Sequence, residues 1–67
     1  MKLAIVKIIF KDGSIGYFKD EDHITSFKDQ AFKAEVNYAN GLCRGLNFAI
    51  QTYEDELTDY AEVELCK

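Results

Sequence analysis

An uninterrupted apolar run that ends in a turn signal constrains this chain more than any other feature. The run, LAIVKIIF at residues 3–10, contains four β-branched residues, one phenylalanine and a single lysine. A run of this composition predicts a strand. Both faces of the strand are apolar, so we expect it to be central in its sheet and covered on both sides, at least in part.

The next residues predict a hairpin. Asp12-Gly13 follows the run at once, and this pair favours a type I′ turn because that turn needs two residues with positive φ. The second strand is then expected at about Ser14–Lys19, with Ile15 and Tyr17 on one face and Phe18 on the other. Ile24-Thr25 is expected to add a short edge segment.

The middle of the chain predicts a helix from about Phe27 to Asn40. Ser26 would be its N-cap, with Asp29 at the acidic position of a capping box, and Gly41 would end it. One apolar stripe at helical spacing would face the sheet; it comprises Phe27, Ala31, Ala34, Tyr38 and Leu42.

A second stripe in the same segment comprises Phe32, Val36, Ala39 and Cys43. At 100° per residue its centre lies about 130° from that of the first stripe, so one sheet face cannot easily bury both. Two interpretations are open. Either a loop covers the second stripe, or it is an exposed strip used for dimerisation or for a second contact with a partner.

The last third of the chain alternates between apolar and polar residues. Leu46–Tyr53 and Tyr60–Cys66 are therefore expected to be strands, joined by an acidic loop at about Glu54–Asp59. The alternative is a C-terminal helix from Tyr53, capped by Thr52, because good helix formers dominate this stretch.

These elements predict one compact α+β domain over residues 1–67, with a ββαββ order. The expected architecture is an antiparallel four-stranded sheet with one helix packed on a face. A chain of 67 residues buries little surface on its own. We therefore expect homodimerisation, or docking on a larger protein, to complete the burial.

Charge is distributed unevenly along the chain. Residues 1–33 contain six Lys and five acids, a net charge of +1, whereas residues 34–67 contain Arg44 and Lys67 against seven acids, a net charge of −5. An acidic surface of this kind repels a phosphate backbone, so no direct binding of nucleic acid is expected. Carboxylates beside aromatic side chains would suit a basic protein surface instead.

The residues predicted to bind such a partner are Tyr53, Glu54, Asp55, Glu56, Asp59 and Tyr60. Two simpler interpretations remain open: the acids serve solubility, and the two tyrosines pack on neighbouring strands.

No combination of residues indicates catalysis, a metal or a cofactor. His23 is the only histidine and lies among three acids, which favours a solvated loop. Cys43 and Cys66 have the spacing of neither a redox motif nor a zinc site. The N-terminus shows no secretion signal and the sequence no membrane span, so we expect free thiols in a cytoplasmic protein that is not an enzyme.

Three segments resemble the Dmd-type antitoxins of T-even phages, which neutralise a host RNase toxin by binding it. Lys7-Ile8-Ile9-Phe10 is similar to that family's first strand, and Ile24-Thr25 followed by Lys28-Asp29 is similar to the approach to its helix. The Glu62-Val63-Glu64-Leu65-Cys66 segment resembles its terminal strand. The Asp12-Gly13 hairpin and the longer acidic loop depart from the family pattern. In size and acidity the chain is equally similar to anti-CRISPR proteins.

The resemblance implies a small protein-binding inhibitor from a phage or mobile element, which would block a host defence nuclease or toxin by occupying its surface. Two alternatives remain open. One is a structural or assembly protein that self-associates through its apolar outer faces. The other is an acidic DNA mimic whose strand carboxylates copy phosphates.

Overall fold

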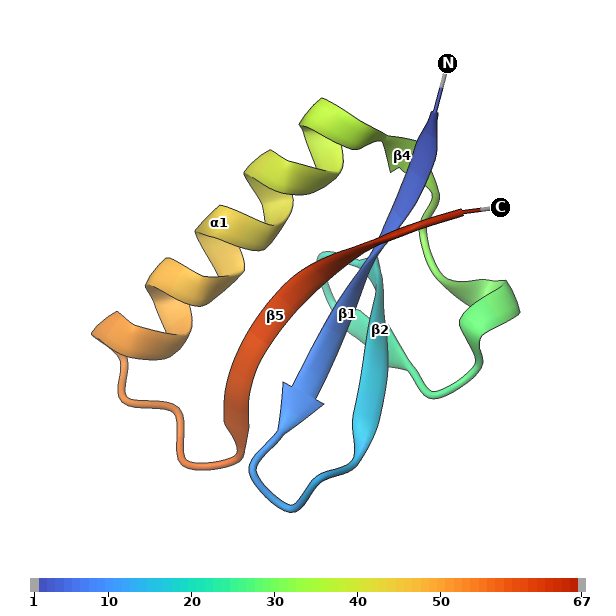
Figure 1. Ribbon diagram of the computed structural model, residues 1–67. Helices are drawn as coiled ribbons and strands as arrows, with labels where there is room; N and C mark the ends of the chain where they lie inside the picture. Colours follow the sequence, from blue (N-terminus) through green and yellow to red (C-terminus); the bar gives the residue numbers. More distant parts are fainter. Residues whose placement is uncertain (1, 67) are drawn as a thin grey trace.

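The computed structural model describes residues 2–66 as one sheet with a single α-helix packed against it (Figure 1). The five strands are β1 (Leu3–Phe10), β2 (Ile15–Asp20), β3 (His23–Thr25), β4 (Ala34–Glu35) and β5 (Thr58–Leu65). The helices are a short 3₁₀ turn, η1 (Lys28–Gln30), and α1 (Val36–Thr52). The predicted class, a small α+β domain with one helix on an antiparallel sheet, is confirmed.

Strand β1 is central, as its two apolar faces predict. It pairs with β2 on one side and, over almost its whole length, with the C-terminal strand β5 on the other. β3 extends the sheet beyond β2, and β4 adds a two-residue pairing with Leu3 and Ala4. All of these pairings are antiparallel.

The Asp12-Gly13 hairpin is confirmed, but its turn is not of type I′. Among the non-glycine residues described only Glu54 has a positive φ, so Asp12 does not meet the requirement of that turn. Gly13 has φ 90°, and its N–H donates to the carbonyl of Phe10. The Asp12 carboxylate accepts from both the N–H and the hydroxyl of Ser14, which fixes the corner.

The predicted helix at Phe27–Asn40 is wrong in position. Ser26 is not an N-cap; residues 27–33 form an irregular segment around η1, and α1 begins after Glu35, whose side chain accepts the N–H of Asn37. Gly41 lies inside α1 rather than at its end. Helix α1 ends at Thr52, and two residues later Glu54 adopts φ 49°, the left-handed conformation that commonly follows a helix.

The structure also tests the two strands that were predicted after Gly41. The predicted strand at Leu46–Tyr53 is wrong, because those residues continue α1 up to Thr52. The predicted strand at Tyr60–Cys66 is confirmed as β5, and the alternative of a C-terminal helix from Tyr53 is wrong.

The core lies between α1 and the face of the sheet that carries the even-numbered residues of β1. Its buried members are Ala4, Val6, Ile8, Ala39 and Ala61. Ala39 has no exposed surface, and Val36 and Cys43 of the same helix pack against this cluster. The expectation of an exposed strip at Phe32, Val36, Ala39 and Cys43 is therefore wrong for its three helical members, which form the side of α1 that faces the sheet, whereas Phe32 lies outside the helix and is exposed.

Candidate functional site

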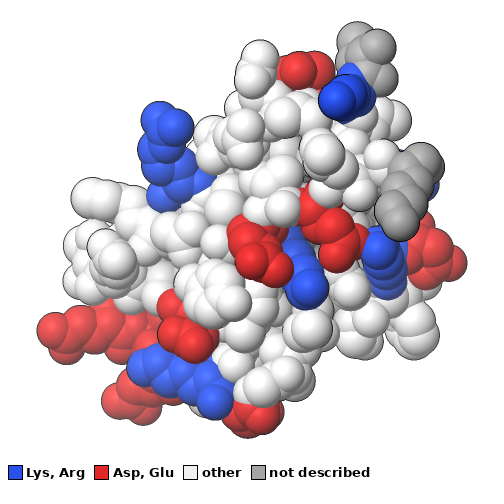
Figure 2. Space-filling model, viewed as in Figure 1, with Lys and Arg blue, Asp and Glu red and all other residues white. Residues whose placement is uncertain are grey.

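The predicted partner-binding residues lie where α1 ends and β5 begins, beside the β1–β2 hairpin (Figure 1). The two loops are joined by a hydrogen bond from the N–H of Lys11 to the carbonyl of Leu57. Figure 2 shows acidic groups gathered at this end of the molecule, together with basic atoms. Hydrogen bonds from the N–H groups of Leu57 and Thr58 lower the pKa of the Asp55 carboxyl, and the charge of Lys11 adds a smaller effect. This neighbouring cation could not be predicted from the local sequence, because Lys11 is 44 residues away from Asp55 along the chain.

Asp55 has a structural role within the loop. Its Oδ1 accepts the backbone N–H groups of Leu57 and Thr58, each at 2.8 Å. These two hydrogen bonds lower the pKa of the carboxyl, with a smaller contribution from Lys11. Asp55 therefore holds the loop in shape, whereas Glu54 and Glu56 are exposed on either side of it.

Acid should weaken this loop. Because the folded pKa of Asp55 lies below its ordinary value of 3.8, its stabilising effect is complete above that value and is lost as the pH falls through the folded pKa. We expect Asp55→Asn to show a shallower fall in Tm than the wild type between about pH 4 and pH 2, measured by circular dichroism. Glu21→Gln, which removes one exposed carboxyl elsewhere, should keep the wild-type slope. Equal slopes for Asp55→Asn and the wild type would contradict this role.

Apolar side chains project beside the acids. Tyr53 is 80% exposed and Leu57 is 75% exposed, which are unusual values for large side chains. Phe48, one turn before the end of α1, is 70% exposed. Side chains of this size in the company of carboxylates are typical of a surface that contacts another macromolecule.

The six predicted residues do not form one flat patch. Tyr60 pairs with Ile9 of β1, so strand alternation places it on the sheet face opposite α1. Tyr53 instead follows the end of α1 and lines a hollow with Ile8 and Leu46. Asp59 lies in β5 at the bulge where the register against β1 shifts. Tyr53, Glu54, Glu56 and Leu57 thus remain as one exposed group, which we call the acidic end.

The carboxylates along β5 are paired within the molecule. Glu62 and Glu64 both lie within 4 Å of the Lys7 ammonium, at 3.6 and 3.9 Å, and Glu64 also contacts Lys28 at 2.5 Å. The contact with Glu64 raises the pKa of Lys28. Figure 2 shows this alternation of acidic and basic groups over the middle of the view. β5 therefore does not present a row of free negative charges.

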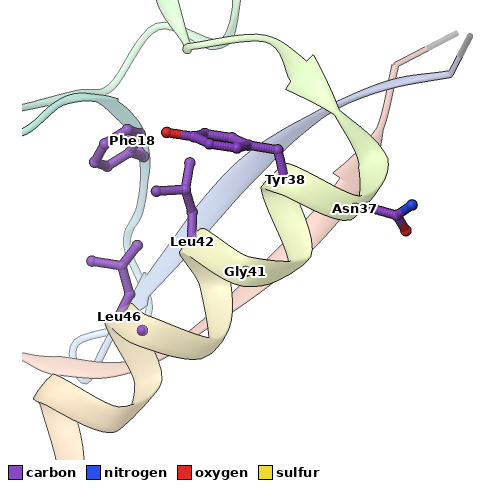
Figure 3. Close-up of a pocket in the computed structure, with 7 residues that line it drawn as sticks. Phe18, Asn37, Tyr38, Gly41, Leu42 and Leu46 are labelled. Carbon is purple, nitrogen blue, oxygen red and sulfur yellow. The ribbon is translucent and has the colours of Figure 1, made fainter.

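An apolar hollow runs along the flank of α1 facing β2 (Figure 3). Tyr38 points toward Phe18 across it, while Leu42 and Leu46 form its wall and Asn37 points away. Gly41 and Gly45 also line it, and an added Cβ at either would meet no atom within 4 Å. The helix surface is consequently flat at these two positions.

Asn47 is a residue that sequence reasoning missed. Its side-chain amide donates to the carbonyl of Ala61 at 2.9 Å and accepts the N–H of Ala61 at 2.8 Å. The amide therefore forms hydrogen bonds with both the N–H and the carbonyl of Ala61, as a neighbouring β-strand would. The sequence analysis placed Asn47 in a predicted strand, and a strand at this position gave no reason to expect a side-chain contact with β5.

The fold places this chain in the class of small α+β domains with a one-helix, antiparallel-sheet architecture. In comparisons with known proteins, no family model, no curated protein and no solved structure matches the chain. Within residues 2–66, no three metal-ligating side chains gather into a group that could hold an ion. The one long helix of the described chain is not long and apolar enough to span a membrane.

Proposed function

We propose that this chain is a non-enzymatic, protein-binding inhibitor that presents its acidic end to a basic surface of a larger protein. A host defence nuclease or toxin is the kind of partner that the resemblance to phage counter-defence proteins implies. The observation that carries the proposal is the exposure of Tyr53 and Leu57, which flank Glu54 and Glu56 in the sequence.

Local energetics support a role beyond folding for these residues. The C-terminus of a helix carries partial negative charge, and an acid there costs about 0.3–1 kcal/mol. Glu54 and Glu56 nevertheless follow α1, whereas the carboxylate of Asp55 between them accepts backbone N–H groups of the loop. Glu54 also has φ 49°, a conformation that costs a non-glycine residue about 1 kcal/mol. Departures from local preference of this kind are expected where a surface is kept for binding.

The chemistry of the acidic end indicates how it would bind. Rigid aromatic and aliphatic area at Tyr53 and Leu57 would supply contact surface, and Glu54 and Glu56 would steer the chain toward a cationic groove. Because these charges are exposed, their contribution should weaken as salt is raised.

The proposal is tested with immobilised protein in a bacterial lysate. We expect wild-type protein to capture a partner that Glu54→Lys/Glu56→Lys captures at least tenfold less. The matched control is Glu21→Lys/Asp22→Lys, which makes the same charge change in the exposed β2–β3 turn and should capture the partner like wild type. Asp55 is left unchanged because it shapes the loop.

The salt dependence of the purified pair provides the second measurement. Affinity of the wild type should fall between about 50 and 500 mM salt, and that of the double variant should change much less. The proposal fails if all three baits capture the same proteins to the same extent.

A further inference from the structure

The side of α1 that faces away from the sheet carries an exposed aromatic ring beside two positions without side chains. At 100° per residue, Gly41, Gly45, Phe48 and Thr52 fall within an arc of about 60° opposite the buried Ala39. Phe48 is 70% exposed there, and neither glycine would meet a neighbouring atom if it had a Cβ. A glycine inside a helix costs about 1 kcal/mol relative to alanine, so Gly41 and Gly45 each lower the stability of α1.

Charges along the same helix are arranged so that the surface complements itself. Arg44 is the only basic residue of α1 and lies four residues before Phe48, about 6 Å along the axis. Arg44 is at the middle of α1, and Glu54 and Glu56 follow its C-terminal end. In Figure 2 a basic group projects beside α1, and acidic groups lie below it.

We propose that this outer side of α1 binds a second copy of the chain, with the two α1 helices antiparallel about a two-fold axis between Gly45 and Phe48. Each Phe48 ring then lies over Gly45 of the other copy, where the absent side chain leaves room. Each Arg44 then lies opposite residue 49 of the other copy. That copy's helix ends at Thr52, about 4.5 Å further along the axis, so its Glu54 and Glu56 come within reach of the guanidinium.

Two further properties favour the antiparallel arrangement. Side chains on a helix lean toward its N-terminus, so Arg44 leans toward the acidic end of the other copy rather than away from it. Antiparallel helices also bring the positive end of each helix dipole toward the negative end of the other. A parallel pair would instead bring the two acidic ends together.

The interface would be small, since one helix face contributes nearly all of it. Interfaces of this size form reversible dimers rather than permanent ones. The dimer would cover carboxylates that the proposed function assigns to the partner, so self-association and partner binding would compete. The dimer itself does not rest on the proposed function, because its measurement requires no partner.

Complementary charge reversals provide the test. Sedimentation velocity from about 0.02 to 1 mM chain should show a concentration-dependent dimer for wild type. Arg44→Glu alone and Glu54→Arg/Glu56→Arg alone should each raise the dissociation constant at least tenfold, because each places like charges at both contacts. An equimolar mixture of these two variants should restore a dimer, because the mixed pair has opposite charges at both contacts.

Controls separate this contact from general effects of charge. Lys19→Glu changes the net charge as Arg44→Glu does, at an exposed position of β2, and should leave the dimer unchanged. The inference is overturned if wild type remains monomeric at about 1 mM, if the single-side variants dimerise like wild type, or if their mixture stays monomeric. Partner capture by Arg44→Glu, which keeps Glu54 and Glu56, reports on the proposed function separately.

Discussion

Asn47→Ala lowers the free energy of unfolding by about 3 kcal/mol, because it removes the side-chain amide that binds two main-chain groups of β5. Ala61 is 4% exposed, so water cannot easily replace the lost amide. A buried donor or acceptor left without a partner costs about 1–3 kcal/mol, and here there is one of each. A domain of this length has roughly 3–10 kcal/mol of total stability, so the variant should be close to unfolding.

Asn40→Ala is the matched control for this effect. It makes the same substitution in the same helix at an exposed position, where alanine has the higher helix propensity. Urea titrations followed by circular dichroism would give both free energies. Stabilities of Asn47→Ala and Asn40→Ala within about 0.5 kcal/mol of each other would show that the amide does not hold β5.

Ala39→Asp is expected to unfold the chain, whereas Phe48→Asp leaves it folded. Ala39 has no exposed surface and lies between α1 and the sheet, so a carboxylate there would be buried without a partner at a cost of several kcal/mol. Phe48 is on the outer side of the same helix, where aspartate reaches water. Far-ultraviolet circular dichroism and thermal unfolding of both variants would distinguish the two sides.

This pair of variants also tests which side of α1 is available to other molecules. If Ala39→Asp remained folded with wild-type stability, the interpretation of residues 36, 39 and 43 as an exposed strip would return. Loss of structure in Phe48→Asp would mean that the outer side contributes to the monomer core.

The strands were predictable because their patterns are local. LAIVKIIF followed by Asp12-Gly13 specifies β1 and the hairpin by composition and turn chemistry alone. The alternation of Glu62, Val63, Glu64 and Leu65 likewise specifies β5, since one side faces Lys7 and the other faces the core. In the hairpin prediction the turn type was wrong, because a single glycine with positive φ closes this hairpin.

The helix was misplaced because Ser26 was interpreted as its start and Gly41 as its end. Gly41 and Gly45 weaken a helix locally, but packing of Val36, Ala39 and Cys43 on the sheet outweighs that weakness. Leu46 and Ile50 continue the same side at helical spacing. Their segment also alternates with a period of two, and so short a stretch fits both periods.

The candidate site could be predicted only as a stretch of sequence. The separate roles of its acidic residues depend on contacts between distant segments. Asp55 binds backbone N–H groups across the loop. Lys11 belongs to the β1–β2 hairpin, which is bonded to the same loop. The ion pair of Glu64 with Lys28 likewise depends on the position of the irregular segment around η1 relative to β5.

The pairing of the first strand with the last has a consequence for how the molecule reaches its native state. Lys7 and Glu62 are neighbours in the sheet although 55 residues separate them along the chain. Closing so large a loop is entropically unfavourable, and contacts of high sequence separation slow folding. During synthesis, the edge of β1 that does not pair with β2 stays uncovered until β5 has been made. The nascent chain therefore exposes an apolar strand edge until β5 has been synthesised, the interval in which assistance by a chaperone would matter most.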